Sequence, residues 1–392
     1  MSKGGKDIDI LLYGATGYTG RLVAAELLAG APPGLRIGWA GRSAARLAAL
    51  QAELAGARRA STVEVTLYPA SLTDAGTLHA LARQSCVLLN AAGPFARLAA
   101  PLVQAAVAER ADYADLSGEP AHVQALLRHH SAAIAAGVRL VPCCGFDSVP
   151  FDMGVWMMVQ AQPAATRLHI EAVLEGVGGY SGGSLHTATC ALAALSRAEW
   201  HALWGPEAAG APWRSCRYDR RLRAWCAPMP SVDRQIVALS AARLPHYPAD
   251  FRYTQWVATP SLPRLLGMGL GTYALSLGAR SPWVRQTLQR IKAPGTGPSM
   301  AARAGGWFAL HLYASDGDRQ LRGLVAGGEP GYTETARIFA AAGLSLWSSR
   351  QQGQPAGGVL TPAAALAAPY LARLRACGLH FTVLSAPPQR TA

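Results

Sequence analysis

The chain has 392 residues, of which 51% are hydrophobic and 15% are charged. This composition excludes intrinsic disorder, and the length suits two domains with a sizeable core. The formal net charge is +13, and almost all of it comes from arginine, because lysine occurs only at positions 3, 6 and 292. The arginines are scattered and do not alternate with aromatic residues in blocks. We therefore expect no nucleic-acid partner, but attraction to anionic cofactors, acidic substrates or a lipid surface.

The seven cysteines have irregular spacings and do not form a disulfide pattern. No C-x-x-C pair is matched by a second one, as a zinc site would require, so we expect no metal site. A reducing, cytoplasmic environment follows from this cysteine usage. Lys3 and Lys6 precede an apolar run, but Asp7 and Asp9 interrupt it, so the run predicts a strand and not a signal peptide.

The first predicted elements are an apolar strand over residues 8–13, a glycine-rich turn over 14–20 and a helix over 21–28. A strand, a glycine turn and a helix in this order are typical of dinucleotide binding. The pyrophosphate of the cofactor would lie at the positive end of the helix, where free N–H groups point at it. A glycine-rich turn without ligand is the alternative that the strand and the helix argue against.

Three glycines of this turn have separate expected roles. Gly14 allows the tight turn, Gly17 lets backbone N–H groups reach the pyrophosphate, and Gly20 lets helix and strand pack closely. Tyr18 would contact the nicotinamide or cover the pocket. The cofactor-binding residues predicted from this turn are Gly14, Thr16, Gly17, Tyr18, Thr19 and Gly20.

The second predicted strand, over residues 35–40, indicates which cofactor binds. An NAD site places an acidic residue at the end of this strand to hold the ribose 2′-hydroxyl. Here the strand is followed by Gly41, Arg42 and Ser43, with no acid nearby. A guanidinium and a hydroxyl suit a 2′-phosphate, so we predict NADP(H). Ser43 is also expected to cap the helix that begins at Ala44.

Strand and helix signals alternate through the first 150 residues. Further strands are predicted over 63–67, 86–90, 112–116 and 138–142, with helices over 97–110 and 119–136 between them. This alternation predicts an α/β fold, a Rossmann domain with a doubly wound parallel sheet, over residues 1–150.

A second, α+β domain with a mostly antiparallel sheet is predicted over residues 151–330. Its signals are a helix over 149–160, a strand over 167–173, short extended segments over 217–259 and a hairpin around Asp316-Gly317. Residues 331–392 contribute helices from Tyr332 and Thr361 and a last strand over 379–384, which complete the fold.

The segment 265–279 is uncharged and lies between Arg264 and Arg280. It is too short to span a membrane, which needs about 20 apolar residues. We expect a buried or dimer-interface helix, and peripheral contact with a membrane surface, which the basic flanks suit, is the alternative.

In a doubly wound sheet, ligands bind beyond the carboxyl ends of the strands. The loops 90–95, 115–119 and 143–150 follow the fourth, fifth and sixth predicted strands. We expect the first of these loops to lie against the nicotinamide ribose through Asn90, Ala91, Gly93 and Pro94.

Several polar residues in these loops have two interpretations. Asp147 precedes a helix and is expected mainly as its N-cap, with general acid catalysis as the alternative. Ser117 and Glu119 also resemble a helix start. Cys143 and Cys144 are expected to be packed and inert, not nucleophilic.

These motifs together resemble the saccharopine dehydrogenase-like oxidoreductases. Within that family the chain is similar to the trans-acting enoyl reductases of lipid and polyketide assembly. The resemblance implies an NADP-binding Rossmann domain and an α+β domain whose sheet often supports a homodimer. It rests on the glycine turn and residues 40–43, 90–95, 112–119 and 145–150, and continues through 180–184, 297–299, 327–336 and 358–363.

The short-chain dehydrogenases use a similar glycine turn, but they need a Tyr with a Lys four residues later. No tyrosine here has that partner, since there is no lysine between Lys6 and Lys292. A semialdehyde dehydrogenase would need a thiol with a base, for which no local support exists.

Hydride transfer to an enoyl thioester fits the remaining features, because the cofactor supplies the chemistry and the protein orients the substrate. The substrate would be a small molecule or an acyl group bound to a carrier. We expect Phe146 and the glycine-rich turn residues Ser181, Gly182 and Gly183 to contact it. The catalytic candidates are Tyr18, Ser117 and Asp147. Saccharopine-type amino-acid oxidation and an NADP-binding sensor or scaffold without turnover are the alternatives.

Overall fold

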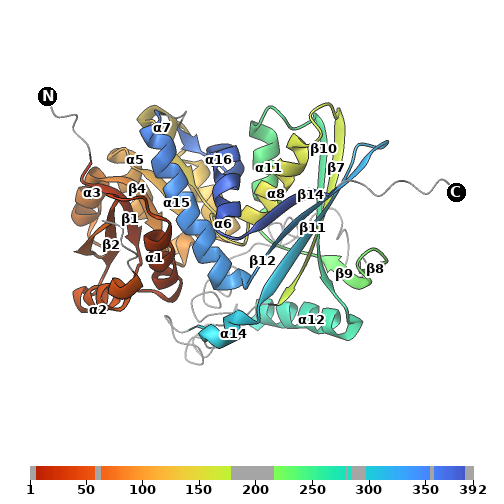
Figure 1. Ribbon diagram of the computed structural model, residues 1–392, viewed down its shortest axis with the longest axis horizontal. Helices are drawn as coiled ribbons and strands as arrows, with labels where there is room; N and C mark the ends of the chain where they lie inside the picture. The colour runs from red at the N-terminus through yellow and green to blue at the C-terminus, as the bar shows by residue number, and fades with distance from the viewer. Residues whose placement is uncertain are drawn as a thin grey trace.

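Two seven-stranded sheets organise the chain, with helices α8, α11, α15 and α16 lying between them in Figure 1. The structure, a computed structural model, describes residues 6–57, 63–177, 216–278, 281, 283, 297–353 and 357–384. The first sheet (sheet A) contains the N-terminal strands, and the second (sheet B) contains most of the later ones. The fold is therefore an α/β Rossmann domain joined to an α+β domain, as predicted.

Sheet A has the strand order β13-β6-β5-β4-β1-β2-β3, and every neighbouring pair is parallel. Strands β1 and β4 are buried along their whole length, as expected for central strands of a parallel sheet covered on both faces. The predicted doubly wound sheet is confirmed. Its strands are β1 (Ile8–Tyr13), β2 (Arg36–Gly41), β3 (Glu64–Pro69), β4 (Ser85–Asn90), β5 (Asp112–Asp115), β6 (Arg139–Val141) and β13 (Gly358–Val359).

The helices of the first 150 residues differ from the prediction in two places. The expected helix 97–110 is split into α4 and α5, because Pro101 has no N–H to continue the hydrogen bonding of α4. The expected helix 119–136 is likewise split into α6 and α7. The helices are α1 (Tyr18–Gly30), α2 (Ala44–Leu54) with the short 3₁₀ turn Ala55–Ala57, α3 (Ala75–Gln84), α4 (Phe95–Leu98), α5 (Ala100–Ala108), α6 (Pro120–Leu127) and α7 (His130–Ala136).

Sheet B has the order β14-β12-β11-β7-β10-β9-β8 and is mixed, because β7 and β10 run parallel while the other pairs are antiparallel. The predicted hairpin is confirmed: Ser315 pairs with Gln320, and Gly317 adopts φ +104° in the turn. The strands are β7 (Arg167–Val177), β8 (Arg217–Asp219), β9 (Ala224–Pro228), β10 (Asp250–Thr259), β11 (Trp307–Ser315), β12 (Gln320–Gly327) and β14 (His380–Leu384).

Helix α8 begins and ends where the sequence predicts, at residues 149 and 160. Helix α11 was not predicted, because only extended segments were expected between residues 217 and 259. It buries Ile236, Val237 and Ser240 as one stripe between proline-rich connections. The later helices are α8 (Val149–Gln160), α11 (Asp233–Arg243), α12 (Leu262–Gly278), α14 (Met300–Ala304), the π-helical turn Pro330–Glu334, α15 (Thr335–Gln351) and α16 (Pro362–Ala376).

The C-terminal part of the chain belongs to both sheets. Helix α15 packs on α1 and against β1, β4 and β5, so it covers one face of sheet A. Strand β13 extends sheet A, whereas β14 extends sheet B. Arg139 reinforces this packing: it is buried, forms an ion pair with Asp112, and donates to the Leu346 carbonyl of α15 at 2.9 Å. The two sheets are therefore fixed relative to each other by late-sequence elements.

Helix α12 (Leu262–Gly278) includes residues 265–278 of the uncharged segment predicted from the sequence. Of its described side chains only Leu265 is buried, so the expectation of a buried helix is wrong for the described side chains, and a dimer-interface helix stays a prediction. No helix in the described part of the chain has the length and apolarity needed to cross a membrane.

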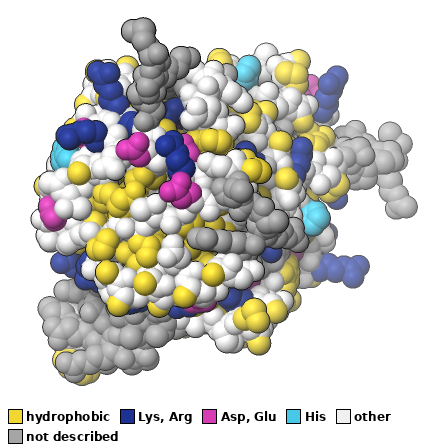
Figure 2. Space-filling model, turned by 60° about the vertical axis from the view of Figure 1, so that its left-hand side comes forward, with side chains coloured by type: hydrophobic (Ala, Val, Ile, Leu, Met, Phe, Trp, Pro, Cys, Tyr) yellow, Lys and Arg dark blue, Asp and Glu magenta, His cyan; other side chains and the backbone are white. Residues whose placement is uncertain are grey.

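The positive charge is dispersed over the face of the molecule that Figure 2 draws. In Figure 2 the dark-blue Lys and Arg side chains stand around the described part of that face and are not gathered in one stripe. Positive charges spread in this way attract anions generally but do not mark one groove for a nucleic acid.

Candidate functional site

A cleft of about 1080 Å³ lies between the carboxyl edge of sheet A and the adjoining ends of β7, β10 and β11. One side is lined by the glycine turn and by the loops that follow β2, β3, β4, β5 and β6. The other side is lined by strand ends of sheet B, by the first half of α12 and by residues 330–335. This is the position at which open α/β sheets bind ligands.

The glycine turn has the geometry expected of a nucleotide-binding turn. Gly14 has φ +82°, and its N–H donates to the Ala40 carbonyl of β2 at 2.9 Å. A Cβ on Gly20 would lie 2.1 Å from the Gly14 carbonyl oxygen, so helix and turn can approach this closely only with glycine there. Both predicted roles are confirmed. These glycines keep the turn tight and hold α1 close to it, so a dinucleotide fits a cradle made of backbone groups.

Helix α1 begins at Tyr18, and its N-cap Gly17 provides no side-chain hydrogen bond. Gly17, Tyr18 and Thr19 line the cleft, as does Thr16 just before them. The first N–H groups of this 13-residue helix are consequently available to an anion at the positive end of the helix dipole.

Two arginines face the cleft beside the turn. Arg42 lies there as predicted, and Arg46 lies one helical turn further on, with a guanidinium that donates to the Thr16 carbonyl at 3.0 Å. Ser43 is not among the cleft residues; its hydroxyl accepts from Arg46 N–H at 3.3 Å, so the predicted N-cap of α2 is confirmed. Sequence reasoning missed Arg46, because it inspected only the end of β2.

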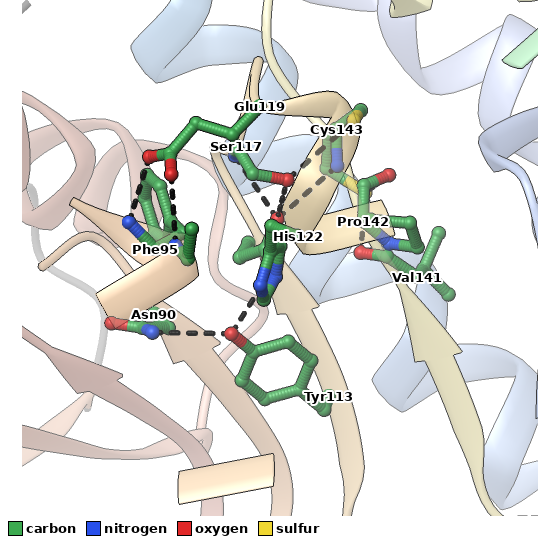
Figure 3. A network of polar contacts seen from close by, with 12 residues as sticks. Asn90, Phe95, Tyr113, Ser117, Glu119, His122, Val141, Pro142 and Cys143 are labelled. Carbon is green, nitrogen blue, oxygen red and sulfur yellow. Dashed lines mark hydrogen bonds and ion pairs between the residues drawn. The ribbon is translucent and has the colours of Figure 1, made fainter. Parts of the chain in front are cut away.

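The loop after β4 is held at both ends (Figure 3). Asn90 is buried; its side-chain oxygen accepts from Ala92 N–H at 3.0 Å, and its amide donates to the Tyr113 hydroxyl at 3.1 Å. At the far end, Glu119 accepts from the N–H groups of Phe95 and Ala96, both at 2.8 Å. Between these clamps, Ala91 and Gly93 line the cleft, while Pro94 follows a cis peptide bond and is not a lining residue.

A buried carboxylate, Asp115, accepts hydrogen bonds from Tyr113, Ser117 and His122, three residues that Figure 3 labels. It accepts from the Tyr113 hydroxyl at 2.9 Å, from His122 Nε2 at 2.6 Å and from the Ser117 hydroxyl at 2.6 Å. The backbone N–H groups of Ser117 and Cys143 add bonds of 3.0 and 3.2 Å. The network joins the ends of β4, β5 and β6, so it fixes three loops that line the cleft.

Ionisation of the Asp115–His122 pair follows from this environment. Burial disfavours both charges, but the attraction between them and the hydrogen bonds outweigh it: the pKa of Asp115 is lowered and that of His122 is raised. Ser117, a predicted catalytic candidate, is buried and its hydroxyl is bound to Asp115. The structure therefore places Ser117 behind the cleft wall, not in the cleft.

Cys143 and Cys144 are completely buried, and burial raises the pKa of both thiols well above the ordinary value. The prediction that they are packed and inert is confirmed. Cys143 has φ +59°, a left-handed conformation at the end of β6 that Asp115 stabilises by accepting its N–H.

Asp147 does not cap α8, so the structural role favoured by the sequence is wrong. The N-cap is Ser148, which makes no capping bond and donates instead to Asp233 at 3.3 Å. The Asp147 side chain is exposed to the cleft, with Oδ2 3.0 Å from where a Cβ on Gly118 would lie. Surrounding protein still desolvates this carboxyl and raises its pKa.

Two aromatic residues join the halves of the cleft. Phe146 lines it and packs edge-on against Phe308 of β11, with ring centroids 4.8 Å apart. Tyr18 packs edge-on against Tyr332 at 5.0 Å, and its hydroxyl donates to the Pro298 carbonyl. Desolvation raises the pKa of Tyr18. Its hydroxyl is thus engaged in holding distant segments together.

The predicted substrate residues Ser181, Gly182 and Gly183 lie outside the described residues. Sequence reasoning missed most of the lining contributed by sheet B and its neighbours. These residues are apolar and come from separate elements, so no local motif marks them. They include Leu174, Val257, Met268, Trp307 and Phe308.

Comparisons with known proteins agree with this geometry. Residues 10–141 match the family model described as the saccharopine dehydrogenase NADP binding domain. The trans-acting enoyl reductase of Mycobacterium leprae is 30% identical, with 97% of this chain and 98% of that protein covered. A Mycobacterium tuberculosis protein that bears the same name with a provisional qualifier is 34% identical, over 95% of this chain and 97% of its own length.

Among solved structures, the apo saccharopine dehydrogenase (L-Glu forming) of Saccharomyces cerevisiae superimposes with a TM-score of 0.56 at 13% identity. The alignment covers 97% of this chain and all of the yeast chain, which shows a shared fold. The NADP-binding match and the full-length relatives together identify the family. The chain belongs to the saccharopine dehydrogenase-like, NADP(H)-dependent oxidoreductases, in the group that includes the trans-acting enoyl reductases.

Proposed function

We propose that this oxidoreductase reduces the carbon–carbon double bond of an enoyl thioester, presented as a small molecule or on an acyl carrier. The names of the full-length relatives support this reaction. The observation that carries the proposal is the apolar lining of the substrate half of the cleft, which is described below.

The substrate half begins where the glycine turn and the β4 loop end. Phe146, Trp307 and Phe308 provide aromatic surface there, and Met268 and Val257 add aliphatic surface. An acyl chain would remove this surface from water, at about 25 cal/mol for each Å² of apolar area buried.

The charged residues in the substrate half of the cleft argue against saccharopine as the substrate. Saccharopine carries several carboxylates, which need cationic partners. Among the described residues that line this half, Arg264 is the cation, whereas Asp147 and Glu175 are acidic. The side chain of Glu175 contacts His311 Nε2 at 3.1 Å. This balance of charge favours an acyl substrate over an amino-acid substrate with several carboxylates.

NADPH, when bound, supplies a hydride to the β-carbon of the enoyl group. The chain itself must then stabilise the negative charge that develops on the thioester and deliver a proton to the α-carbon. We assign the proton to Asp147. Of the three candidates in the described chain, it is the one whose side chain faces the cleft without a hydrogen bond to protein. Its raised pKa favours the protonated, donating form.

Turnover with two substrates tests the proposal. Purified protein is given NADPH with a short enoyl thioester of pantetheine, and in parallel NADP with saccharopine. We expect NADPH oxidation with the enoyl thioester and a saturated product that carries deuterium at the β-carbon when deuterated NADPH is used. Reduction of NADP by saccharopine, with no enoyl turnover, would establish the alternative instead.

A further inference from the structure

Residues 261–306 contain six basic residues and no acidic one. The same segment is rich in Leu, Met and Gly and includes Trp283. Its described parts are α12, α14, residues 281 and 283, and the approach to β11 from residue 297. A long stretch with this composition has the chemistry of a surface that meets an anionic, partly apolar partner.

Exposed hydrophobic side chains concentrate at the same edge of the molecule. Six of the twelve large hydrophobic side chains that are exposed in the described chain belong to α12, α14 and the adjoining ends of β7 and β11. Figure 1 shows α12 and α14 along the lower edge of the molecule, with one end of β11 beside them. We call this set the apolar rim: Val177, Leu266, Met268, Leu270, Met300 and Trp307.

The apolar rim is strongly exposed. Leu270 is 70% exposed and Met300 is 80% exposed, and Trp283, five residues beyond the end of α12, is 73% exposed. Isolated surface hydrophobics are ordinary, but a set that shares one edge indicates an interaction site.

Helix α12 connects the apolar rim to the cleft. Arg264 and Met268 are one turn apart and line the cleft, and Met268 is also exposed at its mouth. Leu266 and Leu270, also one turn apart, are exposed and do not line the cleft. Gly267, Gly269 and Gly271 have open space where a Cβ would lie, so close packing within the chain does not explain them. Glycine lowers helix propensity, so a partner that covers α12 would stabilise it.

We propose that the apolar rim docks on an anionic lipid surface, with α12 lying in the plane of that surface and the mouth of the cleft opening toward it. Leu and Trp side chains flanked by basic residues are typical of helices that bind at a lipid interface. The part of the inference that concerns substrate rests on the proposed function: an acyl chain would pass along α12, between Met268 and Trp307, into the apolar half of the cleft.

Vesicle binding by the full-length protein tests the docking without any substrate. Protein is mixed with vesicles of phosphatidylcholine or of phosphatidylcholine and phosphatidylglycerol in equal parts, and the bound fraction is measured by flotation. We expect clear preference for the anionic vesicles, weakened when salt is raised from about 0.1 to about 0.5 M. The double variant Leu266→Glu/Leu270→Glu should reduce partitioning by about tenfold or more.

A matched control is Ile134→Glu on α7, which changes a 50% exposed aliphatic side chain far from α12 in Figure 1. It should bind vesicles as the unaltered protein does, and NADPH binding should confirm that all three proteins are folded. Equal binding to neutral and anionic vesicles, or undiminished binding by the double variant, overturns the proposal. A third outcome also overturns the proposal. If the unaltered protein binds no vesicles and is a dimer in light scattering, and the double variant is a monomer, then the apolar rim joins two copies of the chain.

Turnover of the short, soluble enoyl thioester separates this proposal from the proposed function. The double variant should retain it, since neither leucine lines the cleft. Vesicle binding with no enoyl turnover would leave the docking intact and remove the proposed reaction. Enoyl turnover with no vesicle binding would do the reverse.

Discussion

The two halves of the cleft are built in different ways. The cofactor half comes from short loops at the ends of neighbouring parallel strands, and it is rich in glycine and other small residues that leave the backbone open to a ligand. The substrate half is assembled from the loop before α8 and from β7, β10, β11 and α12, which are far apart in the chain, and presents mainly side chains. The first half should therefore be sensitive to single atoms in the backbone cradle, and the second to how the two sheets pack.

The substitution Gly20→Ala should have the largest effect on the cofactor half and little effect on the substrate half. The added Cβ would lie 2.1 Å from the Gly14 carbonyl oxygen, so the turn and α1 must separate. We expect NADPH affinity, measured by fluorescence quenching or calorimetry, to fall on the order of a hundredfold, about 3 kcal/mol. Gly56→Ala is the control, because no atom lies within 4 Å of its Cβ position. If Gly20→Ala binds NADPH within threefold of the affinity of the unaltered protein, then close packing of the backbone in the turn does not determine cofactor binding.

Asp147→Asn tests the chemistry at the boundary between the halves. The amide keeps the shape but cannot donate a carboxylic proton, so kcat should fall about a hundredfold while the Kd for NADPH is unchanged. Because the protonated form is required, the kcat of the unaltered protein should decline as pH rises through the raised pKa of Asp147, and the variant should lack this decline. An equal loss with Glu175→Gln would contradict the assignment.

Arg42→Ala and Arg46→Ala test whether these two arginines of the cofactor half bind the 2′-phosphate. Each removes one guanidinium from the cleft wall beside the turn. If both reach the 2′-phosphate, each should weaken NADPH binding about tenfold, near 1.5 kcal/mol, and leave NADH binding nearly unchanged. Arg83→Ala, at an exposed ion pair with Glu109, is the control. An unchanged NADPH/NADH affinity ratio in Arg46→Ala would limit that residue to holding the Thr16 carbonyl.

The smallest expected effect on turnover comes from His122→Asn, which acts behind the cleft wall. Losing the buried partner of Asp115 should lower the free energy of unfolding by about 3 kcal/mol near pH 6. A His pKa that is raised on folding stabilises below the unfolded pKa of about 6.5, and the gain is lost as pH rises through the folded pKa.

The stability difference between the unaltered protein and His122→Asn should therefore shrink above neutral pH, as followed by denaturant unfolding. Asp115 and Glu119 are the acidic groups near His122, and the lowered pKa of Asp115 adds loss of stability only under acidic conditions. His79→Asn, at a partly exposed contact with Glu109, is the control. A pH-independent difference would show that the charge of His122 contributes nothing.

Sequence reasoning worked well where structure is local. The glycine turn, Arg42, the capping role of Ser43 and the Rossmann strands follow from periodicity and turn chemistry within a few residues. It failed where a side chain had two local interpretations and distant packing decided between them. Asp147 resembled a cap, but Ser148 takes that position and leaves the carboxyl facing the cleft.

The Asp115 network and the substrate half show the other limit of sequence reasoning. Asn90 reaches Tyr113 only because β4 and β5 are neighbours in sheet A, and Cys143 reaches Asp115 only because the chain returns beside β5 after β6. Trp307 and Phe308 reach the cleft because the register of sheet B places the start of β11 beside the end of β7. Neither arrangement leaves a pattern within one stretch of sequence.

Helix α15 gives the chain an unusual order of assembly. The cofactor loops are complete by residue 150, yet α1 and α2 cover only part of one face of sheet A, and the rest is covered when residues 335–351 pack on α1, β1, β4 and β5. During synthesis the nucleotide-binding half thus cannot finish folding as an independent N-terminal unit, the usual course for multidomain chains. A fragment ending near residue 330 would carry every cofactor motif. It would still expose an apolar, aggregation-prone surface of sheet A to chaperones and to other nascent chains.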